Sequence, residues 1–266
     1  MKNILLISTS GRAAGAAVCR GGKVVRSKLS DNGLTHSETI MPLIDGLFDD
    51  EIKLCDMDAV CADVGPGSFT GVRIGVCIAN AMAYALKLPV IEVSSLRALA
   101  DAVDTERPIC ALIDARNGNG YAALYENGKE LIAPKAVAVS EFIAELPQNT
   151  VFTGDGAKTY RNAIAAAVPD AAFAAEEKHM LTANMLAKCA DGKLERGETC
   201  EEACHRRTLP AYSPMASLNA AKHAKKRARC TLGQRRRSAC IKRRSSKNER
   251  YCPPDAGDGY RQGIRA

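Results

Sequence analysis

The chain has 266 residues, of which 46% are hydrophobic and 25% are charged, and its formal net charge is +7. This length allows one large core or two modest ones, and the hydrophobic fraction is ordinary for a globular protein. No run of 18 or more apolar residues occurs, so we expect no membrane span. The apolar stretch after Lys2 is too short for a signal peptide and suits a first buried strand.

The distribution of charge along the chain and the positions of the cysteines indicate where the protein works. Residues 213–266 hold 15 of the 37 Lys and Arg and 3 of the 30 Asp and Glu, so this segment carries +12 and the rest of the chain −5. Several of the 11 cysteines lie inside apolar patterns, where cysteine behaves as a small hydrophobe. Without an export signal, we expect reduced thiols and a cytoplasmic protein.

The first part of the chain shows a regular order of strand and helix patterns. Apolar segments around a Gly-Gly turn predict three antiparallel strands, over residues 3–8, 13–19 and 24–29. Thr35 and Glu38 form a capping box, and apolar residues then recur at helical spacing to about Phe48. The remaining elements are a strand and helix over 59–86, a strand over 89–93 and a helix over 95–103.

The same order is found again after residue 108. The predicted strands cover 109–115, 121–126, 130–139, 150–153 and 171–174, and the predicted helices cover 140–146, 157–168 and 182–190. This repetition predicts an α/β fold of two tandem domains, each a mixed sheet flanked by helices, in the actin-like, ribonuclease-H-like class. We place the domains at 1–104 and 105–212, followed by a basic tail at 213–266.

A glycine-rich turn separates the strand and the long helix within residues 59–86. Gly65 and Gly67 permit a tight backbone, and Ser68 or Thr70 can cap the helix. A helix start can hold an anion, so these four residues and Arg73 are candidate contacts of an anion or nucleotide. The glycine spacing matches neither common phosphate-binding motif, and a tight turn before a core helix is the alternative interpretation.

Small residues recur along this long helix at every fourth position, namely at Gly71, Gly75, Ala79 and Ala83. Positions four apart lie on one face of a helix. A row of small side chains lets a second helix come close, so this face is either a buried contact inside the monomer or a subunit interface.

The segment GPGSFTGVRIG, which begins at Gly65, resembles the signature of the TsaB (YeaZ) family. The segments HSETIMPLID, VSSLRALA, IDARNGNGYAALY, TGDGA and LPAY also look like motifs of this family, and the resemblance extends from Ile4 to about Tyr212. Members are relatives of the glycoprotease-like TsaD proteins, which act in threonylcarbamoyladenosine synthesis on tRNA. The resemblance implies an actin-like fold and a subunit that works without chemistry of its own.

The resemblance also implies the partners. TsaD and TsaE are the expected protein partners and tRNA the substrate of the complex, while ATP and a divalent metal are expected on the partner subunits. The first helix and the long helix would pack against TsaD, or against a second copy of this chain. The residues assigned to this interface are His36, Glu38, Leu43, Gly71, Gly75, Ala79 and Ala83.

At two positions this chain lacks residues that relatives use to bind metal or phosphate. Ser8 stands where the family usually has an aspartate at the end of the first strand, and such acidic groups help to hold metal and phosphates in nucleotide-binding relatives. TsaD relatives carry two metal-binding histidines four apart, but here His36 is followed at that offset by Ile40. We therefore expect no catalytic residue and no metal ligand. An actin-like ATPase, a kinase or a metallopeptidase is the alternative.

The basic tail at 213–266 suggests a different function, binding of RNA. It is basic and poor in large apolar residues, which predicts disorder. Its charge would attract RNA phosphates, so an RNA-binding protein acting through the tail is a second alternative. The family pattern also stops abruptly at Tyr212, before Ser213 and Pro214, as a shifted reading frame would produce.

Overall fold

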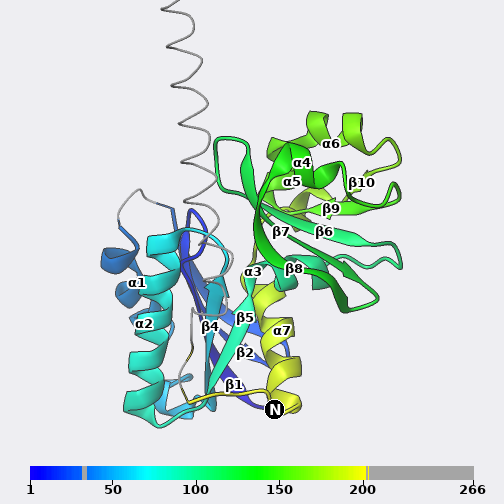
Figure 1. The fold of residues 1–266 in the computed structure, drawn as a ribbon. Coiled ribbons are helices and arrows are strands. Elements are labelled where there is room, and N and C mark those ends of the chain that lie inside the picture. Colours follow the sequence, from blue (N-terminus) through cyan, green and yellow to red (C-terminus); the bar gives the residue numbers. More distant parts are fainter. Residues whose placement is uncertain (32–34, 202, 204–266) are drawn as a thin grey trace, which may run out of the picture. The chain divides into compact units, whose positions relative to one another are not determined.

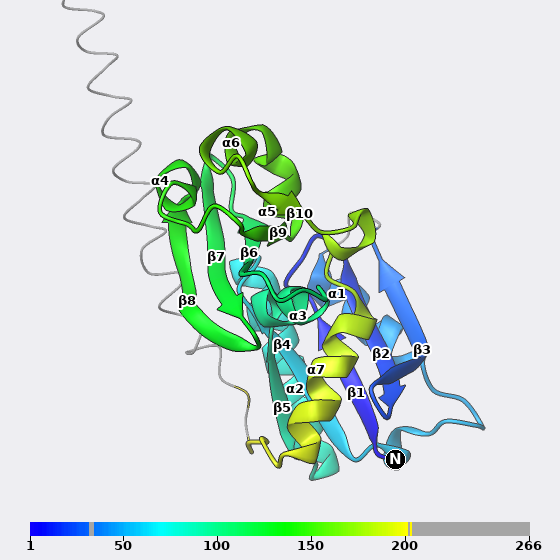
Figure 2. The same ribbon diagram turned by 90° about the vertical axis from the view of Figure 1, so that its right-hand side faces the viewer.

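The computed structural model describes residues 1–31, 35–201 and 203, all of which belong to one compact unit, Met1–Leu218. The LPAY motif and the basic tail lie outside the described residues. Figures 1 and 2 show two mixed β-sheets with helices packed on them.

The first sheet has the strand order β3-β2-β1-β4-β5. Its strands are β1 (Asn3–Ser8), β2 (Ala14–Arg20), β3 (Lys23–Ser30), β4 (Ala59–Gly65) and β5 (Val90–Ser94). Strand β1 pairs antiparallel with β2 and parallel with β4, and β4 pairs parallel with β5. Strands β1 and β4 are buried along most of their length, which explains their continuous apolar sequence.

The second sheet repeats this order as β8-β7-β6-β9-β10. Its strands are β6 (Ile109–Asp114), β7 (Asn119–Glu126), β8 (Lys129–Ala138), β9 (Val151–Thr153) and β10 (Ala172–Phe173). Strand β6 pairs antiparallel with β7 and parallel with β9, as β1 does with β2 and β4. The duplicated strand order confirms the predicted α/β class with two actin-like sheets.

Helices cover both faces of the first sheet (Figure 1). Leu5 and Ile7 pack in the core beneath α1 (His36–Asp45) and α2 (Phe69–Leu86). The alternate residues Ile4 and Leu6 pack on the other face, in the core that includes α7 (Ala183–Glu195). The remaining helical segments are η1 (Leu54–Asp56), α3 (Ser95–Asp101), α4 (Val139–Ile143), α5 (Asp155–Thr159), α6 (Arg161–Ala167) and η2 (Glu176–Lys178).

Several predicted helices have other bounds in the structure. Helix α7 runs to Glu195, past the predicted end at 190, while α3 and α4 end before the predicted 103 and 146. The first predicted helix ends at Asp45 rather than Phe48, and Gly46 is its C-cap residue, with an amide that donates to the Pro42 carbonyl oxygen at 3.1 Å. The helix predicted over 157–168 is two helices, α5 and α6, which meet at Tyr160 in a non-helical conformation. The Tyr160 hydroxyl donates a hydrogen bond of 2.8 Å to Asp114 Oδ1, which ties this junction to the end of β6.

Helix α7 belongs to the first sheet, although it comes from the range 105–212. Its buried residues Leu186, Ala187 and Ala190 pack in one core with β1 residues. Figure 2 shows α7 lying across the strands of this sheet. Farther on, Val90 and Cys200 exchange two backbone hydrogen bonds of 2.8 and 2.9 Å. A cut of the chain into 1–104 and 105–212 would therefore take α7 away from the sheet on which it packs.

Helix α2 is long and apolar enough, by length and composition alone, to cross a membrane, a match that the sequence reasoning did not predict. In the structure, its residues Val72, Val76 and Ala79 are buried in the core of the first sheet. The apolar side chains on one side of α2 therefore form part of the core of the first sheet.

Candidate functional site

The glycine turn joins β4 to α2 as predicted, and its glycines serve close backbone packing. Gly65 has a φ of 80°, which favours glycine, and is followed by a cis peptide bond to Pro66. A Cβ atom on Gly67 would lie 2.3 Å from the Ser10 carbonyl oxygen. Ser68 is the N-cap of α2, since its hydroxyl accepts a hydrogen bond of 3.2 Å from the Gly71 amide. The turn is thus built against the residues that follow β1.

Two amides of this turn already have acceptors within the protein. The Gly65 amide donates to Asp63 Oδ1 at 3.0 Å, and the Ser68 amide donates to the Ser10 carbonyl oxygen at 2.7 Å. These bonds favour the tight-turn interpretation for Gly65 and Ser68. Thr70 and Arg73 are exposed, and their contact with an anion stays a prediction. The Arg73 guanidinium lies 4.7 Å from the centre of the exposed Phe69 ring.

A buried carboxylate at the end of β4 organises this region, and sequence reasoning missed it. Asp63 is only 2% exposed. Its Oδ2 atom accepts hydrogen bonds from the hydroxyls of Ser8 and Ser10, at 2.7 and 2.5 Å. Its Oδ1 atom accepts from the Ser95 hydroxyl at 2.6 Å as well as from Gly65. Neutral donors therefore surround both oxygens, as a buried carboxylate requires.

The cluster of Asp63 with Ser8, Ser10 and Ser95 explains the departure at residue 8. The carboxylate comes from β4, and Ser8 on the neighbouring strand donates to it. The signal in the sequence was an acidic residue inside the apolar segment AVCADVG. Because the carboxylate binds four protein donors, the cluster is suited to fixing the glycine turn rather than to holding a phosphate or metal.

The second sheet carries a smaller acidic pair at the corresponding place. Asp155 Oδ1 accepts a hydrogen bond of 3.0 Å from the Asp114 amide. Burial, together with the nearby Asp114 carboxylate, raises the pKa of Asp155. Among the residues that the structure describes, no group of three His, Cys, Asp or Glu side chains is placed to hold a metal ion.

The row of small residues on α2, the inner row, faces the protein interior. Gly71, Gly75, Ala79 and Ala83 are all buried. A Cβ atom on Gly71 would lie 2.1 Å from the Thr9 carbonyl oxygen, and one on Gly75 would lie 2.4 Å from Thr9 Oγ1. The assignment of these four residues to a partner interface is therefore corrected, because their small size lets α2 pack on the end of β1.

The opposite side of α2 presents an exposed row at the same spacing. This outer row consists of Phe69, Arg73, Cys77, Ala81 and Ala85. It is a part of α2 that a partner can touch, and sequence reasoning missed it because four of its five side chains are, like those of the inner row, small or apolar.

Two further exposed side chains extend this surface. Tyr84 on α2 is 88% exposed, and Met41 on α1 is 48% exposed. Each of the two helices thus has an exposed apolar side chain besides the outer row. Large exposed apolar patches commonly mark interaction sites.

The three residues predicted on α1 lie near this surface but have local roles. His36 is half-buried, and its Nε2 atom donates to the Gly11 carbonyl oxygen at 3.1 Å. The Glu38 carboxylate accepts from the Thr35 amide and hydroxyl at 3.1 and 2.6 Å, so the predicted capping contact is present. Leu43 packs against the first core. Their part in a partner interface stays a prediction.

Thiol chemistry gives a direct check of which side of α2 is exposed. Cys77 and Cys55 are exposed, whereas burial raises the pKa of both Cys19 and Cys189 to about 12. Since the thiolate is the reactive form, iodoacetamide at neutral pH should alkylate Cys77 and Cys55 quickly, and the buried Cys19 only after unfolding. Cys189 is partly exposed and should react slowly because of its raised pKa. Peptide mass spectrometry over time measures these rates. Equal rates for Cys77 and Cys19 in the folded protein would contradict the orientation of α2.

Comparison with known proteins gives the family. The family model described as "TsaD: tRNA N6-adenosine threonylcarbamoyltransferase" matches residues 31–224. The protein named "tRNA threonylcarbamoyladenosine biosynthesis protein TsaB" from Bacillus subtilis is 32% identical over 151 residues, or 54% of this chain and 66% of the relative. Its namesake from Escherichia coli is 37% identical over 132 residues, or 47% and 57% of the two chains. The alignments thus span between about half and two thirds of these relatives.

Solved structures agree with this grouping. "YeaZ from Pseudomonas aeruginosa" is 27% identical with a TM-score of 0.59, and the match covers 75% of this chain and 95% of that one. A second structure from that organism, an uncharacterized protein with similarity to peptidase YEAZ, is 26% identical with a TM-score of 0.62 and coverages of 76% and 95%. With the family match over most of the described residues, the chain belongs to the TsaD family and, within it, to the TsaB (YeaZ) group.

Proposed function

We propose that this chain is a cytoplasmic, non-catalytic subunit that pairs with TsaD. With TsaE, the pair would transfer the threonylcarbamoyl group to the adenosine next to the anticodon of tRNA. The names of the relatives support the process. The observation that carries the pairing is the exposed outer row of α2 beside α1.

The shape of the outer row suits a partner helix. Helix α2 has 18 residues and is therefore about 27 Å long. Cys77, Ala81 and Ala85 have short side chains, so another helix can approach the middle and the C-terminal end of the row closely. Arg73 is the single charged member of the row, and a partner carboxylate would complement it.

The proposal assigns ATP and the divalent metal to the partner subunits. The Asp63 carboxylate is surrounded by protein donors, and the described residues offer no cluster of three metal-ligating side chains. Tight ATP or metal binding by the isolated chain would instead favour the ATPase, kinase or metallopeptidase alternative.

A substitution in the outer row tests the pairing. Ala81→Arg places a long charged side chain in the middle of the row, and because Ala81 is exposed the fold should persist. We expect about a hundredfold weaker binding to TsaD, equivalent to about 2.7 kcal/mol. Threonylcarbamoyladenosine formation with purified TsaC, TsaD and TsaE should fall with it. Calorimetric titration and nucleoside analysis by liquid chromatography measure the two effects.

The matched control is Ala165→Arg, the same change at an exposed position of α6. It should leave TsaD binding and product formation unchanged. Full binding by a folded Ala81→Arg variant, or equal losses in the two variants, would contradict the proposed interface. If the chain forms a homodimer through the same row, sedimentation should show that Ala81→Arg is monomeric.

The RNA-binding alternative rests on the charge of residues 213–266. It predicts that removing these residues abolishes tRNA binding while TsaD pairing persists. Unchanged product formation by the shortened chain would assign the main function to the part before the tail.

A further inference from the structure

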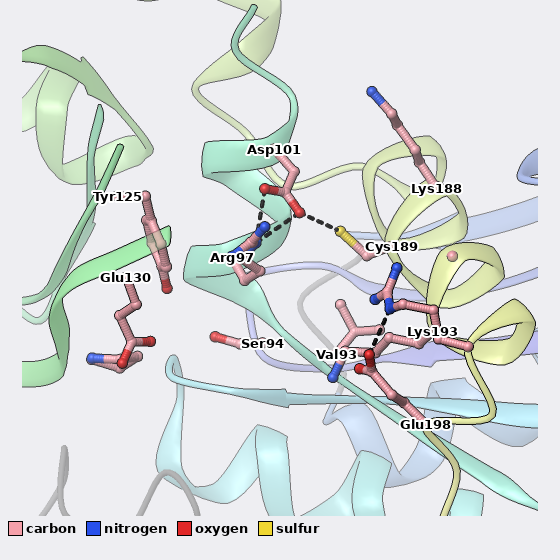
Figure 3. Close-up of a pocket in the computed structure, with 13 residues that line it drawn as sticks. Val93, Ser94, Arg97, Asp101, Tyr125, Glu130, Lys188, Cys189, Lys193 and Glu198 are labelled. Carbon is pink, nitrogen blue, oxygen red and sulfur yellow. Dashed lines mark hydrogen bonds and ion pairs between the residues drawn. The ribbon is translucent and has the colours of Figure 1, made fainter. Parts of the chain in front are cut away.

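A pocket of about 670 Å³ lies where elements of both sheets meet (Figure 3). Its walls are the end of β5, α3, the β7–β8 hairpin, and α7 with the turn that follows it. Neither the glycine turn nor the outer row of α2 contributes to it. A volume of this size is typical of sites for small molecules.

Two arginines in the pocket are already neutralised. Arg97 Nε lies 2.8 Å from the Asp101 carboxylate, and Arg97 Nη1 donates to the Gly128 carbonyl oxygen at 2.8 Å. Arg196 Nε lies 2.5 Å from Glu198. These pairs fix two walls of the pocket, and their charges largely cancel.

Two lysines of α7 form no such pair. Within the part of the chain that the structure describes, Lys188 and Lys193 have no carboxylate within ion-pair distance. The Glu198 carboxyl, whose pKa is lowered by its hydrogen bond to Arg196 and more weakly by the charge of Lys193, is nevertheless close enough to Lys193 to act on it. Lys193 Nζ donates to the Glu92 carbonyl oxygen at 2.8 Å, which positions its ammonium group and leaves two N–H bonds. Lys188 extends away from the other labelled side chains in Figure 3, so Lys193 is the better placed cation.

Two hydroxyl groups line the same pocket. Ser94 is the N-cap residue of α3, yet its side chain makes no capping bond, and its buried oxygen has no hydrogen-bond partner among the described residues. An unpaired buried hydroxyl is unfavourable unless a ligand pairs with it. The second hydroxyl is that of Tyr125, a protonated donor at neutral pH as in any tyrosine, and burial raises its pKa further. The Arg97 guanidinium covers the Tyr125 ring at 5.4 Å.

We propose that this pocket binds a small molecule that carries an oxyanion, either a carboxylate or a phosphate ester. Lys193 supplies the positive charge and the Ser94 hydroxyl donates a hydrogen bond to the same ligand. Glu130 of the hairpin, which has no ion-pair partner among the described residues, lines another wall. It selects ligands whose far end offers a hydroxyl or an amine. Such a ligand would contact elements of both sheets at once.

Calorimetric titration of the full chain with inorganic phosphate, and separately with malonate, tests the proposal at constant ionic strength set with chloride. We expect saturable binding of at least one probe. Phosphate binding alone would indicate a phosphate ester, and malonate binding alone would indicate a carboxylate. Lys193→Gln should weaken the binding by about tenfold, the usual effect of losing one charge-assisted hydrogen bond.

Three further variants separate this pocket from other basic groups of the chain. Lys193→Arg should retain most of the affinity, and Ser94→Ala should lower it several-fold without unfolding the protein. Lys23→Gln removes an exposed lysine outside the pocket and should have no effect. The absence of saturable binding with both probes would overturn the proposal. Equal affinities of the unmodified chain, Lys193→Gln and Ser94→Ala would also overturn it.

Discussion

Gly71→Ala should destabilise the protein by about 2 kcal/mol or more, although the same change inside a helix normally stabilises by about 1 kcal/mol. The added Cβ atom would lie 2.1 Å from the Thr9 carbonyl oxygen and 3.1 Å from the His36 ring. The Thr9 backbone follows β1 directly and cannot move without disturbing the sheet. Urea unfolding measures the change in the free energy of unfolding.

Gly192→Ala is the matched control for this prediction, since Gly192 also lies inside a helix. Its Cβ atom would meet only the end of the flexible Arg196 side chain, at 3.3 Å. This variant should gain about 0.5–1 kcal/mol from helix propensity. Opposite signs for the two glycines are the expected result. A gain in stability for both would show that α2 does not pack on Thr9 in solution.

Asp63→Ala is the second substitution with a large expected effect, a loss of about 3 kcal/mol or more. Removing the carboxylate leaves the hydroxyls of Ser8, Ser10 and Ser95 without their acceptor in a buried site. The matched control is Asp58→Ala, where an exposed carboxylate accepts one bond of 2.7 Å from the Asn3 amide. This control should cost about 1 kcal/mol or less.

A substitution at Ser8, in the same cluster, tests how a second negative charge beside Asp63 affects stability. Ser8→Asp restores the residue usual in the family, but here it places a second carboxylate beside Asp63, so stability should fall. The loss should shrink in acid, because one carboxylate can then take up a proton. In the double variant Ser8→Asp, Asp63→Ser the carboxylate changes strands, and much of the loss should be recovered. Strictly additive effects in urea unfolding would contradict this coupling.

The sequence contains strong local signals for much of the fold. The capping box of Thr35 and Glu38 marked the start of α1, and the Gly21–Gly22 turn marked the hairpin between β2 and β3. Repetition of the same pattern was enough to predict two sheets of the same kind. These signals work because capping and turn formation depend on neighbours within a few residues.

The candidate site was harder to predict, because its contacts join distant parts of the chain. Ser8 and Ser95 lie 55 and 32 positions from Asp63 in the sequence, and no local pattern connects them. Helix α2 carries small or apolar residues on both sides, so periodicity could not show whether Gly75 or Ala81 faces outward. Only the position of Thr9 against α2 decides between the two rows.

The placement of α7 has a consequence for synthesis on the ribosome. Strands β1 to β5 leave the exit tunnel about ninety residues before α7, yet Ile4, Leu6 and Ile91 need α7 to cover them. During this interval the nascent chain exposes one apolar sheet face, which is the kind of surface that chaperones bind. The first sheet to be synthesised is thus the last to be covered.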